Sequence, residues 1–280
     1  MSVDVSATTR IFGVVGYPVR HSLSPRMQNA ALQSAGDDGV YVAFEVAPDG
    51  LEDALRGFAA AGIAGVNVTV PHKEAAARWV ETLTPEATRA GAVNTIAFRD
   101  GRTEGHNTDG LGFVRAANRL VGTVEGKRIL LLGAGGAGRG VGSALRDAGA
   151  ELVLANRTME KITDLGRQWQ AECVAWDMDS LSAAAEGVDV VVNASSAGMH
   201  GKGTIPLDWA GLASKPAAID LVYAPLETAF LKDASAAGCA IQDGLAMLAA
   251  QGELAYEFWL GHLPPEGVME QTLREQLSPG

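Results

Sequence analysis

The sequence lacks the features of a membrane protein, a disulfide-rich scaffold and a structural zinc protein. Cys173 and Cys239 are the only cysteines, too few and too far apart for a disulfide framework or a zinc site. The five histidines show no metal-ligand spacing. No apolar stretch approaches the roughly 20 residues that span a bilayer, and the polar N-terminal segment lacks the apolar run of a signal peptide. We therefore expect a cytoplasmic protein with reduced thiols and no metal.

Basic residues are scarce relative to acidic ones. The chain has 22 Lys and Arg against 33 Asp and Glu, which gives a formal net charge of -11. An acidic protein is a poor partner for nucleic acid, because the phosphate backbone is bound by basic surfaces. A small anionic substrate stays possible, since the local potential of a cleft can oppose the net charge. We expect a small-molecule substrate, with no nucleic-acid or membrane partner, and either a monomer or a homodimer.

Strand-like and helix-like segments alternate along the 280 residues, a length that fits two ordinary domains. This βαβ pattern predicts an α/β fold with two domains, the first an open, mainly parallel sheet and the second of the Rossmann type. A polar stretch, 100–109, and a connector, 122–128, interrupt the alternation. The predicted strands are 11–16, 41–46, 65–70, 92–98, 129–132, 151–155, 188–194 and 217–223. The predicted helices are 25–35, 51–61, 72–81, 110–121, 137–148, 159–171, 228–237 and 244–260.

A glycine-rich hexamer, Gly133-Ala134-Gly135-Gly136-Ala137-Gly138, follows the apolar strand 129–132 and opens a helical segment. In a dinucleotide-binding turn Gly133 permits the tight bend, Gly135 lets the pyrophosphate approach, and Gly138 packs the helix on the strand. The helix N-terminus adds unpaired N–H groups for the phosphates. A flexible glycine loop is the alternative, since the chain has 34 glycines, but the strand–turn–helix context favours a dinucleotide site.

The end of the next strand indicates which dinucleotide binds. An NAD site usually has Asp or Glu there, about 20 residues after the first glycine, to hold the ribose hydroxyls. This chain has Asn156-Arg157-Thr158 instead, with Lys161 one turn further on. Arg157 and Lys161 can bind a 2′-phosphate, which a carboxylate would repel. They could also be ordinary surface cations, but cations oppose the dipole at a helix N-terminus. We therefore predict NADP.

Lys73 is the candidate proton-transfer group. The segment Asn67-Val68-Thr69-Val70-Pro71-His72-Lys73-Glu74 ends a predicted strand and starts a helix, with Pro71 suited to the first turn. This position is the carboxyl end of a strand, where open α/β sheets bind their ligands. A lysine there can give or take the proton of a substrate alcohol. The alternative is a solvated lysine whose charge Glu74 offsets.

Small polar residues also gather at predicted strand ends. Thr108 or Asp109, in Asn107-Thr108-Asp109-Gly110, could be a helix cap, and so could Ser24, before Pro25. The wider set of hydroxyl and amide side chains is what a polyhydroxylated substrate needs. This set comprises Ser22, Ser24, Thr69 and Asn94.

Taken in order, these segments resemble the shikimate dehydrogenase family over nearly the whole chain. Besides the segments already quoted, the resemblance is carried by Ser22-Leu23-Ser24-Pro25, Ala90-Gly91-Ala92-Val93-Asn94-Thr95, Asn193-Ala194-Ser195-Ser196-Ala197-Gly198-Met199 and Asp243-Gly244-Leu245-Ala246-Met247-Leu248-Ala249-Ala250-Gln251. It implies an NADP-dependent oxidoreductase that reversibly reduces 3-dehydroshikimate to shikimate, on the chorismate route to aromatic amino acids. It also implies that the C-terminal helix returns to the first domain.

The resemblance further implies a role for each matching residue. Lys73 is expected to transfer the proton with Asp109 beside it, in a substrate domain formed by 1–109 and completed by 247–280. The residues 110–246 are expected to bind NADP. The implied substrate contacts are Ser22, Ser24, Thr69, Asn94, Tyr223 and Gln251. The implied cofactor contacts are Gly133, Ala134, Gly135, Gly136, Ala137, Asn156, Arg157, Thr158 and Lys161, with Leu221, Gly244 and Met247 near the nicotinamide.

Three positions depart from the family pattern and leave substrate preference open. Gln28 stands where a histidine is common, Ala246 replaces a glycine, and Glu253 follows close on Gln251. A quinate or shikimate dehydrogenase that also uses NAD is therefore one alternative, and a non-catalytic NADP-binding sensor is another. A folate-type dehydrogenase is disfavoured, because no tyrosine is followed by lysine four residues later.

Overall fold

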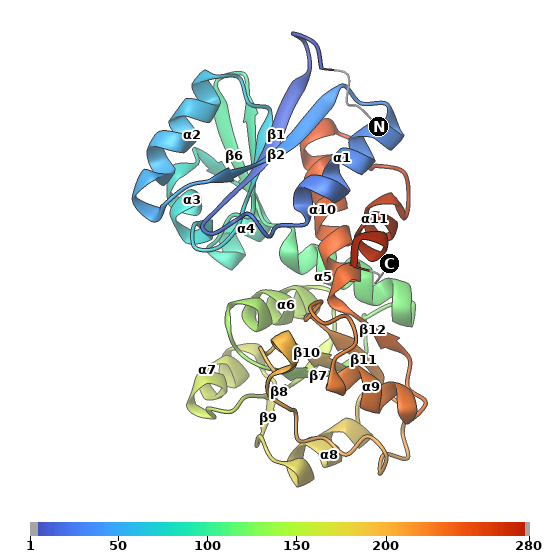
Figure 1. Cartoon of the computed structure of the whole chain (residues 1–280). Helices are drawn as coiled ribbons and strands as arrows, with labels where there is room; N and C mark the ends of the chain where they lie inside the picture. The colour runs from blue at the N-terminus through green and yellow to red at the C-terminus, as the bar shows by residue number, and fades with distance from the viewer. Residues whose placement is uncertain (1–4, 278–280) are drawn as a thin grey trace. The chain divides into compact units, whose positions relative to one another are not determined.

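The computed structural model describes residues 5–277. The chain divides into two compact units (Figure 1). The first unit comprises Met1–Asp109 and Ala249–Gly280, and the second comprises Gly110–Leu248. The boundary near the C-terminus falls inside helix α10 (Gly244–Leu260), so this helix contributes residues to both units.

The first unit is built on a six-stranded sheet with the order β2-β1-β3-β5-β6-β4. All neighbouring strands are parallel except that β5 runs antiparallel to β3 and β6. This confirms a mainly parallel sheet. The strands are β1 (Arg10–Gly16), β2 (Gly39–Glu45), β3 (Gly65–Val68), β4 (Thr82–Leu83), β5 (Thr95–Arg99) and β6 (Arg102–His106).

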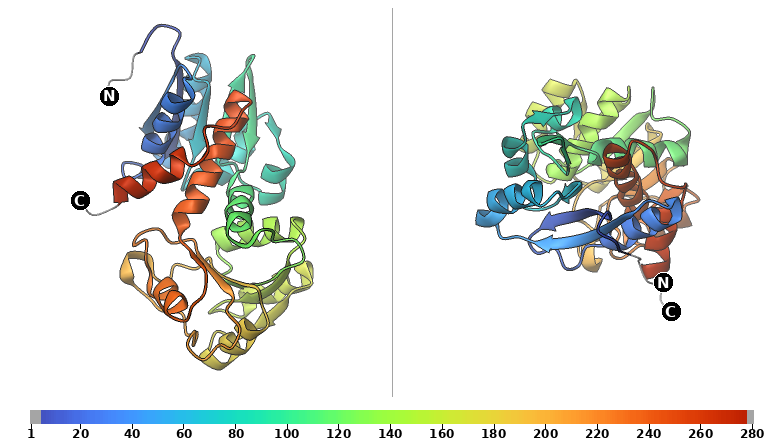
Figure 2. Two further views of the ribbon diagram at one scale, coloured as in Figure 1. Left: turned by 90° about the vertical axis from the view of Figure 1, so that its right-hand side faces the viewer. Right: turned by 90° about the horizontal axis from the view of Figure 1, so that it is seen from above.

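Helices cover both faces of this sheet (Figure 1). Buried Val66, Val68 and Ile96 face α2 (Leu51–Ala60), α3 (Lys73–Trp79) and α4 (Pro85–Ala90). On the other face lie α1 (Ser24–Ala35), α10 and α11 (Val268–Leu277), and α11 packs beside α1 (Figure 2). Trp259 of α10 stacks on Phe12 at 5.2 Å between ring centroids, which joins the C-terminal segment to the sheet.

The polar stretch 100–109, in which no strand was predicted, contains β6. Residues Asp100 and Gly101 both have positive φ, 50° and 74°, and form a two-residue turn between β5 and β6. Asp-Gly is a strong hairpin signal, because both central residues of such a turn need positive φ. The polar composition hid this signal. The hairpin matters because β6 delivers Asp109 to the edge of the sheet.

The second unit has a fully parallel six-stranded sheet with the order β12-β11-β10-β7-β8-β9. Counted in chain order within the unit, this is 6-5-4-1-2-3, the strand order of a Rossmann fold. The predicted fold class is confirmed. The strands are β7 (Arg128–Leu132), β8 (Glu151–Ala155), β9 (Glu172–Val174), β10 (Val190–Asn193), β11 (Ala217–Asp220) and β12 (Ile241–Gln242).

Strand alternation divides the core of the second unit into two layers. Ile129 and Leu131 point to the face covered by α5 (Asp109–Val121), α6 (Gly136–Asp147) and α7 (Glu160–Trp169). Leu130 and Leu132 point to the face covered by α8 (Met178–Glu186) and α9 (Ala229–Ala236). Because both faces are buried, β7 reads as a continuous apolar run rather than an alternating one.

Short elements were missed by the sequence analysis. They are β4, β9, β12, α4, α8 and α11. No described helix has both the length and the apolar content required to cross a bilayer.

We predict that Gly138→Ala destabilises the second unit. A Cβ at Gly138 would lie 2.1 Å from the backbone oxygen of Gly133, so the turn must shift. Overpacking of this kind costs about 1–3 kcal/mol. Urea unfolding of the purified protein should show a lower midpoint.

Gly136→Ala is the matched control in the same turn. A Cβ at Gly136 meets no protein atom within 4 Å, and the residue is helical, so alanine should leave the free energy of unfolding unchanged or raise it by about 0.5–1 kcal/mol. Equal unfolding midpoints for the two variants would contradict the packing role of Gly138.

Candidate active site

An ion pair joins the start of α3 to the start of α5. Lys73 is the first residue of α3, which follows β3 after a short turn, and Asp109 is the first residue of α5, which follows β6 after two residues. The Lys73 Nζ donates to the Asp109 Oδ2 at 2.6 Å, and both side chains are 30% exposed. The pair is therefore formed but open to a ligand. Lys73 contacts Asp109 rather than serving only as a solvated partner of Glu74.

Asn94 fixes the orientation of Asp109. Its Nδ2 donates to the other carboxylate oxygen of Asp109 at 2.8 Å and to the Thr108 Oγ1 at 2.9 Å. Its Oδ1 accepts the backbone N–H of Thr108 at 2.9 Å. Asn94 is buried, so these hydrogen bonds are protected from water. Both oxygens of Asp109 thus contact side chains outside α5, which distinguishes it from a simple helix cap.

A buried polar network that the sequence analysis missed lies behind Asn94. The Tyr41 hydroxyl donates to the Asn67 Oδ1 at 2.7 Å, and the Asn67 Nδ2 donates to the Thr95 Oγ1 at 3.0 Å. Thr95 in turn donates to the Asn94 Oδ1 at 3.0 Å. Burial raises the pKa of Tyr41 well above its usual value, while a hydrogen bond with Ser24 opposes this shift. Tyr41 therefore stays protonated and acts as a donor.

The other predicted substrate residues of the first unit lie at the same edge of the sheet. Ser22 lies in the loop between β1 and α1, and Ser24 is the first residue of α1, where its N–H donates to the Ser22 Oγ at 3.3 Å. Thr69 follows β3, and its N–H donates to Val15 of β1. The carboxyl ends of parallel strands meet at one edge, as does the amino end of antiparallel β5, which Asn94 precedes. Gln251 lies on α10.

The three residues that depart from the family pattern are all buried in helices. Gln28 is buried in α1, and its Nε2 donates to the Gly252 carbonyl at 3.1 Å, which joins α1 to α10. Glu253 and Ala246 are buried residues of α10. Gln28 therefore has a packing and hydrogen-bonding role between two helices.

The two histidines nearest these strands have structural partners. Buried His72 lies with its Nε2 2.8 Å from the Val46 carbonyl. The His106 Nδ1 lies 2.8 Å from the Thr84 Oγ1, and burial lowers the pKa of His106. Within residues 5–277, no group of three or more acidic, His or Cys side chains is arranged to hold a metal.

The glycine turn of the second unit has the backbone form that its sequence predicts. Gly133 has φ of 106°, and a Cβ there would lie 2.9 Å from the backbone nitrogen of Ser195. A Cβ at Gly135 would meet no protein atom within 4 Å, so the space outside the turn is open. The residues present thus fit a pyrophosphate at the N-terminus of α6, with Ala134, Gly136 and Ala137 completing the turn.

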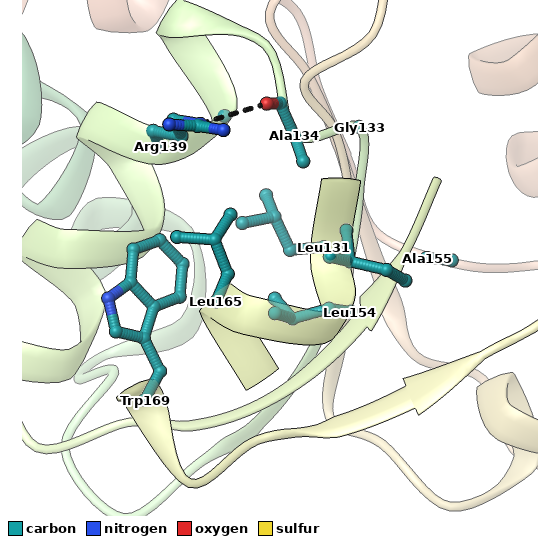
Figure 3. A pocket seen from close by; sticks show the side chains of 10 residues that line it. Leu131, Gly133, Ala134, Arg139, Leu154, Ala155, Leu165 and Trp169 are labelled. Carbon is teal, nitrogen blue, oxygen red and sulfur yellow. Dashed lines mark hydrogen bonds between the residues drawn. The ribbon is translucent and has the colours of Figure 1, made fainter. Parts of the chain in front are cut away.

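An apolar pocket lies behind this turn, between the sheet and α6 and α7 (Figure 3). Leu131, Leu154, Leu165 and Trp169 line it (Figure 3). Arg139 lies at one side, where its Nε donates to the Ala134 carbonyl at 3.3 Å. These side chains support the turn from inside the unit.

The carboxyl end of β8 is joined to the glycine turn through Asn156. Its Oδ1 accepts the backbone N–H of Ala134 at 3.1 Å, and its Nδ2 donates to the Thr158 carbonyl at 2.9 Å. The next residue, Arg157, is exposed, as is Lys161 in the first turn of α7. The structure thus bonds an amide to the glycine turn, and two exposed cations follow that amide along the chain.

The remaining predicted cofactor residues lie at the carboxyl ends of β11 and β12. Gly244 starts α10, and a Cβ there would lie 2.3 Å from the Leu221 carbonyl oxygen. Leu221 and Met247 pack against the same core cluster. Tyr223, beyond β11, is 37% exposed.

A buried carboxylate network, also missed, fixes the loops after β10 and β11. The Asp220 Oδ1 accepts from the Asn193 Nδ2 and the Val222 N–H, both at 2.9 Å, and its Oδ2 accepts from the Thr228 hydroxyl at 2.7 Å. The Asn193 Oδ1 accepts the Ser195 hydroxyl at 2.7 Å. Burial raises the pKa of Asp220. Through Ser195 this network sets the loop that faces Gly133.

Three family models match the chain in order. Residues 14–96 match the shikimate dehydrogenase substrate binding domain, and 115–200 match shikimate / quinate 5-dehydrogenase. Residues 244–274 match the shikimate 5′-dehydrogenase C-terminal domain.

Individual proteins match over nearly their whole length. The shikimate dehydrogenase (NADP(+)) of Thermococcus kodakarensis is 43% identical over 97% of this chain and 98% of the relative. The shikimate 5-dehydrogenase of Thermus thermophilus, solved with NADP(H) and shikimate, is 40% identical with a TM-score of 0.84, covering 95% of this chain and 99% of its own. The ligand-free 5-ketofructose reductase of a Gluconobacter species is 33% identical with a TM-score of 0.87, covering 97% and 100%. The chain belongs to the shikimate dehydrogenase family.

Proposed function

We propose that this chain is an NADP-dependent shikimate dehydrogenase, an oxidoreductase that reversibly reduces 3-dehydroshikimate to shikimate on the chorismate route to aromatic amino acids. The observation that carries this proposal is the Lys73–Asp109 pair, 2.6 Å apart and braced by Asn94 at an open sheet edge. The family relationship supports shikimate as the substrate, since relatives of about 40% identity are named shikimate dehydrogenases.

In the direction of reduction, the Lys73 Nζ donates a proton to the oxygen of the ring carbonyl as the carbonyl carbon is reduced. NADPH, when bound, supplies the hydride. Asp109 orients the ammonium group and accepts a hydrogen bond from a substrate hydroxyl. Asn94 prevents the carboxylate from rotating, because one of its oxygens is already bonded to the amide. In the reverse direction Lys73 takes the hydroxyl proton.

Hydroxyl and amide groups hold the substrate in this proposal. Ser22 and Ser24 bind its carboxylate as hydroxyl donors, and Thr69 and Asn94 bind the ring hydroxyls. Their position at one edge of the first sheet supports these roles. Gln251 and, from the second unit, Tyr223 complete the proposed set. The substrate domain is 1–109 with 247–280.

The cofactor is held by 110–246. Gly133, Ala134, Gly135, Gly136 and Ala137 contact the pyrophosphate, which the open space at Gly135 supports. The remaining proposed contacts are Asn156, Arg157, Thr158 and Lys161 for the adenosine phosphate, and Leu221, Gly244 and Met247 for the nicotinamide.

We also propose a cytoplasmic location. The free thiols Cys173 and Cys239 fit a reducing compartment. A monomer and a homodimer both fit the proposed reaction, and sedimentation of the purified chain distinguishes them.

We predict that Lys73→Ala lowers kcat for shikimate oxidation by about 10²–10⁴-fold, because the proton no longer has an acceptor. The Kd for NADPH, measured by nicotinamide fluorescence, should stay within about twofold, since a proton-transfer residue contributes to the transition state rather than to cofactor binding.

Lys127→Ala is the matched control. Lys127 also forms an ion pair, with its Nζ 3.6 Å from Asp189, and its side chain is 27% exposed. It lies at the amino edge of the second sheet, before β7. The control should keep normal turnover. Near-normal kcat in Lys73→Ala would disprove the role of Lys73.

We predict that shikimate with NADP gives the highest kcat/KM among four combinations, shikimate or quinate with NADP or NAD. Absorbance at the nicotinamide band measures each. Comparable values for quinate or NAD would favour the broader dehydrogenase. An absence of turnover with every combination would favour either a non-catalytic NADP sensor or a reductase of another ketone. The Gluconobacter relative suggests the second alternative, which an assay of 5-ketofructose with NADPH tests directly.

A further inference from the structure

Arg157 lies against an aromatic ring that the proposed reaction does not use. Its guanidinium carbon is 5.7 Å from the centroid of the Trp176 ring, within the range of a cation–π contact. Arg157 follows β8, and Trp176 follows the neighbouring strand β9. Both residues therefore lie at the carboxyl edge of the second sheet, on adjacent loops.

The two partners differ in how firmly they are held. Trp176 is half-buried and packs against the core cluster beneath α8 and α9, whereas Arg157 is exposed. A third loop approaches the same guanidinium, since a Cβ at Gly203 would lie 3.5 Å from the Arg157 Nη2. Gly203 has φ of 77°, a conformation that favours glycine. The ring is thus a platform fixed by the core, and the arginine is its exposed partner.

Contact with a fixed aromatic ring reduces the conformational freedom that an arginine side chain loses when it binds a phosphate. A free arginine side chain has many rotamers, and binding a phosphate in fork geometry requires that most of them be lost. Contact with an aromatic face restricts the guanidinium plane before the ligand arrives and leaves its N–H groups directed outward at the edge. Removing the aromatic face should therefore weaken the binding only of ligands that carry the phosphate.

We propose that Trp176 is a positioning residue that determines the preference for NADP over NAD, by holding Arg157 where it meets the 2′-phosphate. This inference rests on the proposed NADP-dependent function. It adds a residue outside the Asn156–Lys161 segment to the specificity site.

The test compares kcat/KM for NADP and for NAD, with shikimate as substrate, in Trp176→Leu and Trp176→Phe. Leucine keeps apolar packing and removes the aromatic face, whereas phenylalanine keeps both. For Trp176→Leu we expect kcat/KM with NADP to fall about 3- to 10-fold through KM, with kcat and the NAD values within about twofold. Trp176→Phe should retain most of the preference.

Two arginine variants complete the experiment. Arg157→Gln should reduce kcat/KM for NADP by more than about 10-fold and leave NAD unaffected. Arg146→Gln is the matched control, because Arg146 stacks on Trp169 at 5.8 Å in the same unit but lies in the last turn of α6, at the end remote from the glycine turn. It should change neither value.

The outcomes distinguish a failure of the positioning role of Trp176 from a failure of the proposed function. If Arg157→Gln loses NADP preference and Trp176→Leu keeps it, or if Trp176→Leu weakens NADP and NAD equally, the positioning role is overturned. If Arg157→Gln itself has no effect on NADP, the positioning role and the proposed phosphate site both fail, although shikimate turnover still supports the enzyme. An absence of turnover in the unsubstituted chain would instead overturn the proposed function.

Discussion

The ion pair between Lys73 and Asp109 is the interaction on which the proposed chemistry depends. Two flexible or exposed side chains would gain little from such a contact on an open surface. Here both residues start helices within five residues of the end of a strand in one sheet, and the Asn94 Nδ2 donates to the second carboxylate oxygen at 2.8 Å. Attachment to the sheet and the hydrogen bond from Asn94 therefore hold the two side chains in place. An ordered amine at an open edge is what proton transfer to a substrate oxygen requires.

Buried polar side chains support the edges of both sheets. In the first unit, Asn67 and Thr95 connect Asn94 to the interior, and in the second, Asp220 and Asn193 set the loop over Gly133. Each group has partners within hydrogen-bond distance, so burial does not leave it unsatisfied. Both networks hold backbone segments at strand ends, where the fold binds ligands.

The sequence predicted long elements and the local turn well, and the supporting networks poorly. The strand 151–155 and the helix 244–260 agree with β8 and α10 residue for residue, because strong apolar patterns extend over their full length. The hairpin strand β6 was missed because its residues are polar, although Asp100-Gly101 marked the turn. The partnership of Lys73 with Asp109 followed from family resemblance. Contacts such as Asn67 to Thr95 depend on strand register, which local pattern does not specify.

A crystal structure of the chain with shikimate and oxidised NADP tests the role of the Lys73–Asp109 pair. We expect the Lys73 Nζ and the Asp109 carboxylate both to lie within about 2.6–3.2 Å of the hydroxyl that is oxidised. We also expect Asn94 to keep its hydrogen bond to Asp109. If the hydroxyl that is oxidised contacts Lys73 neither directly nor through a water molecule, the proposed proton transfer by Lys73 is contradicted.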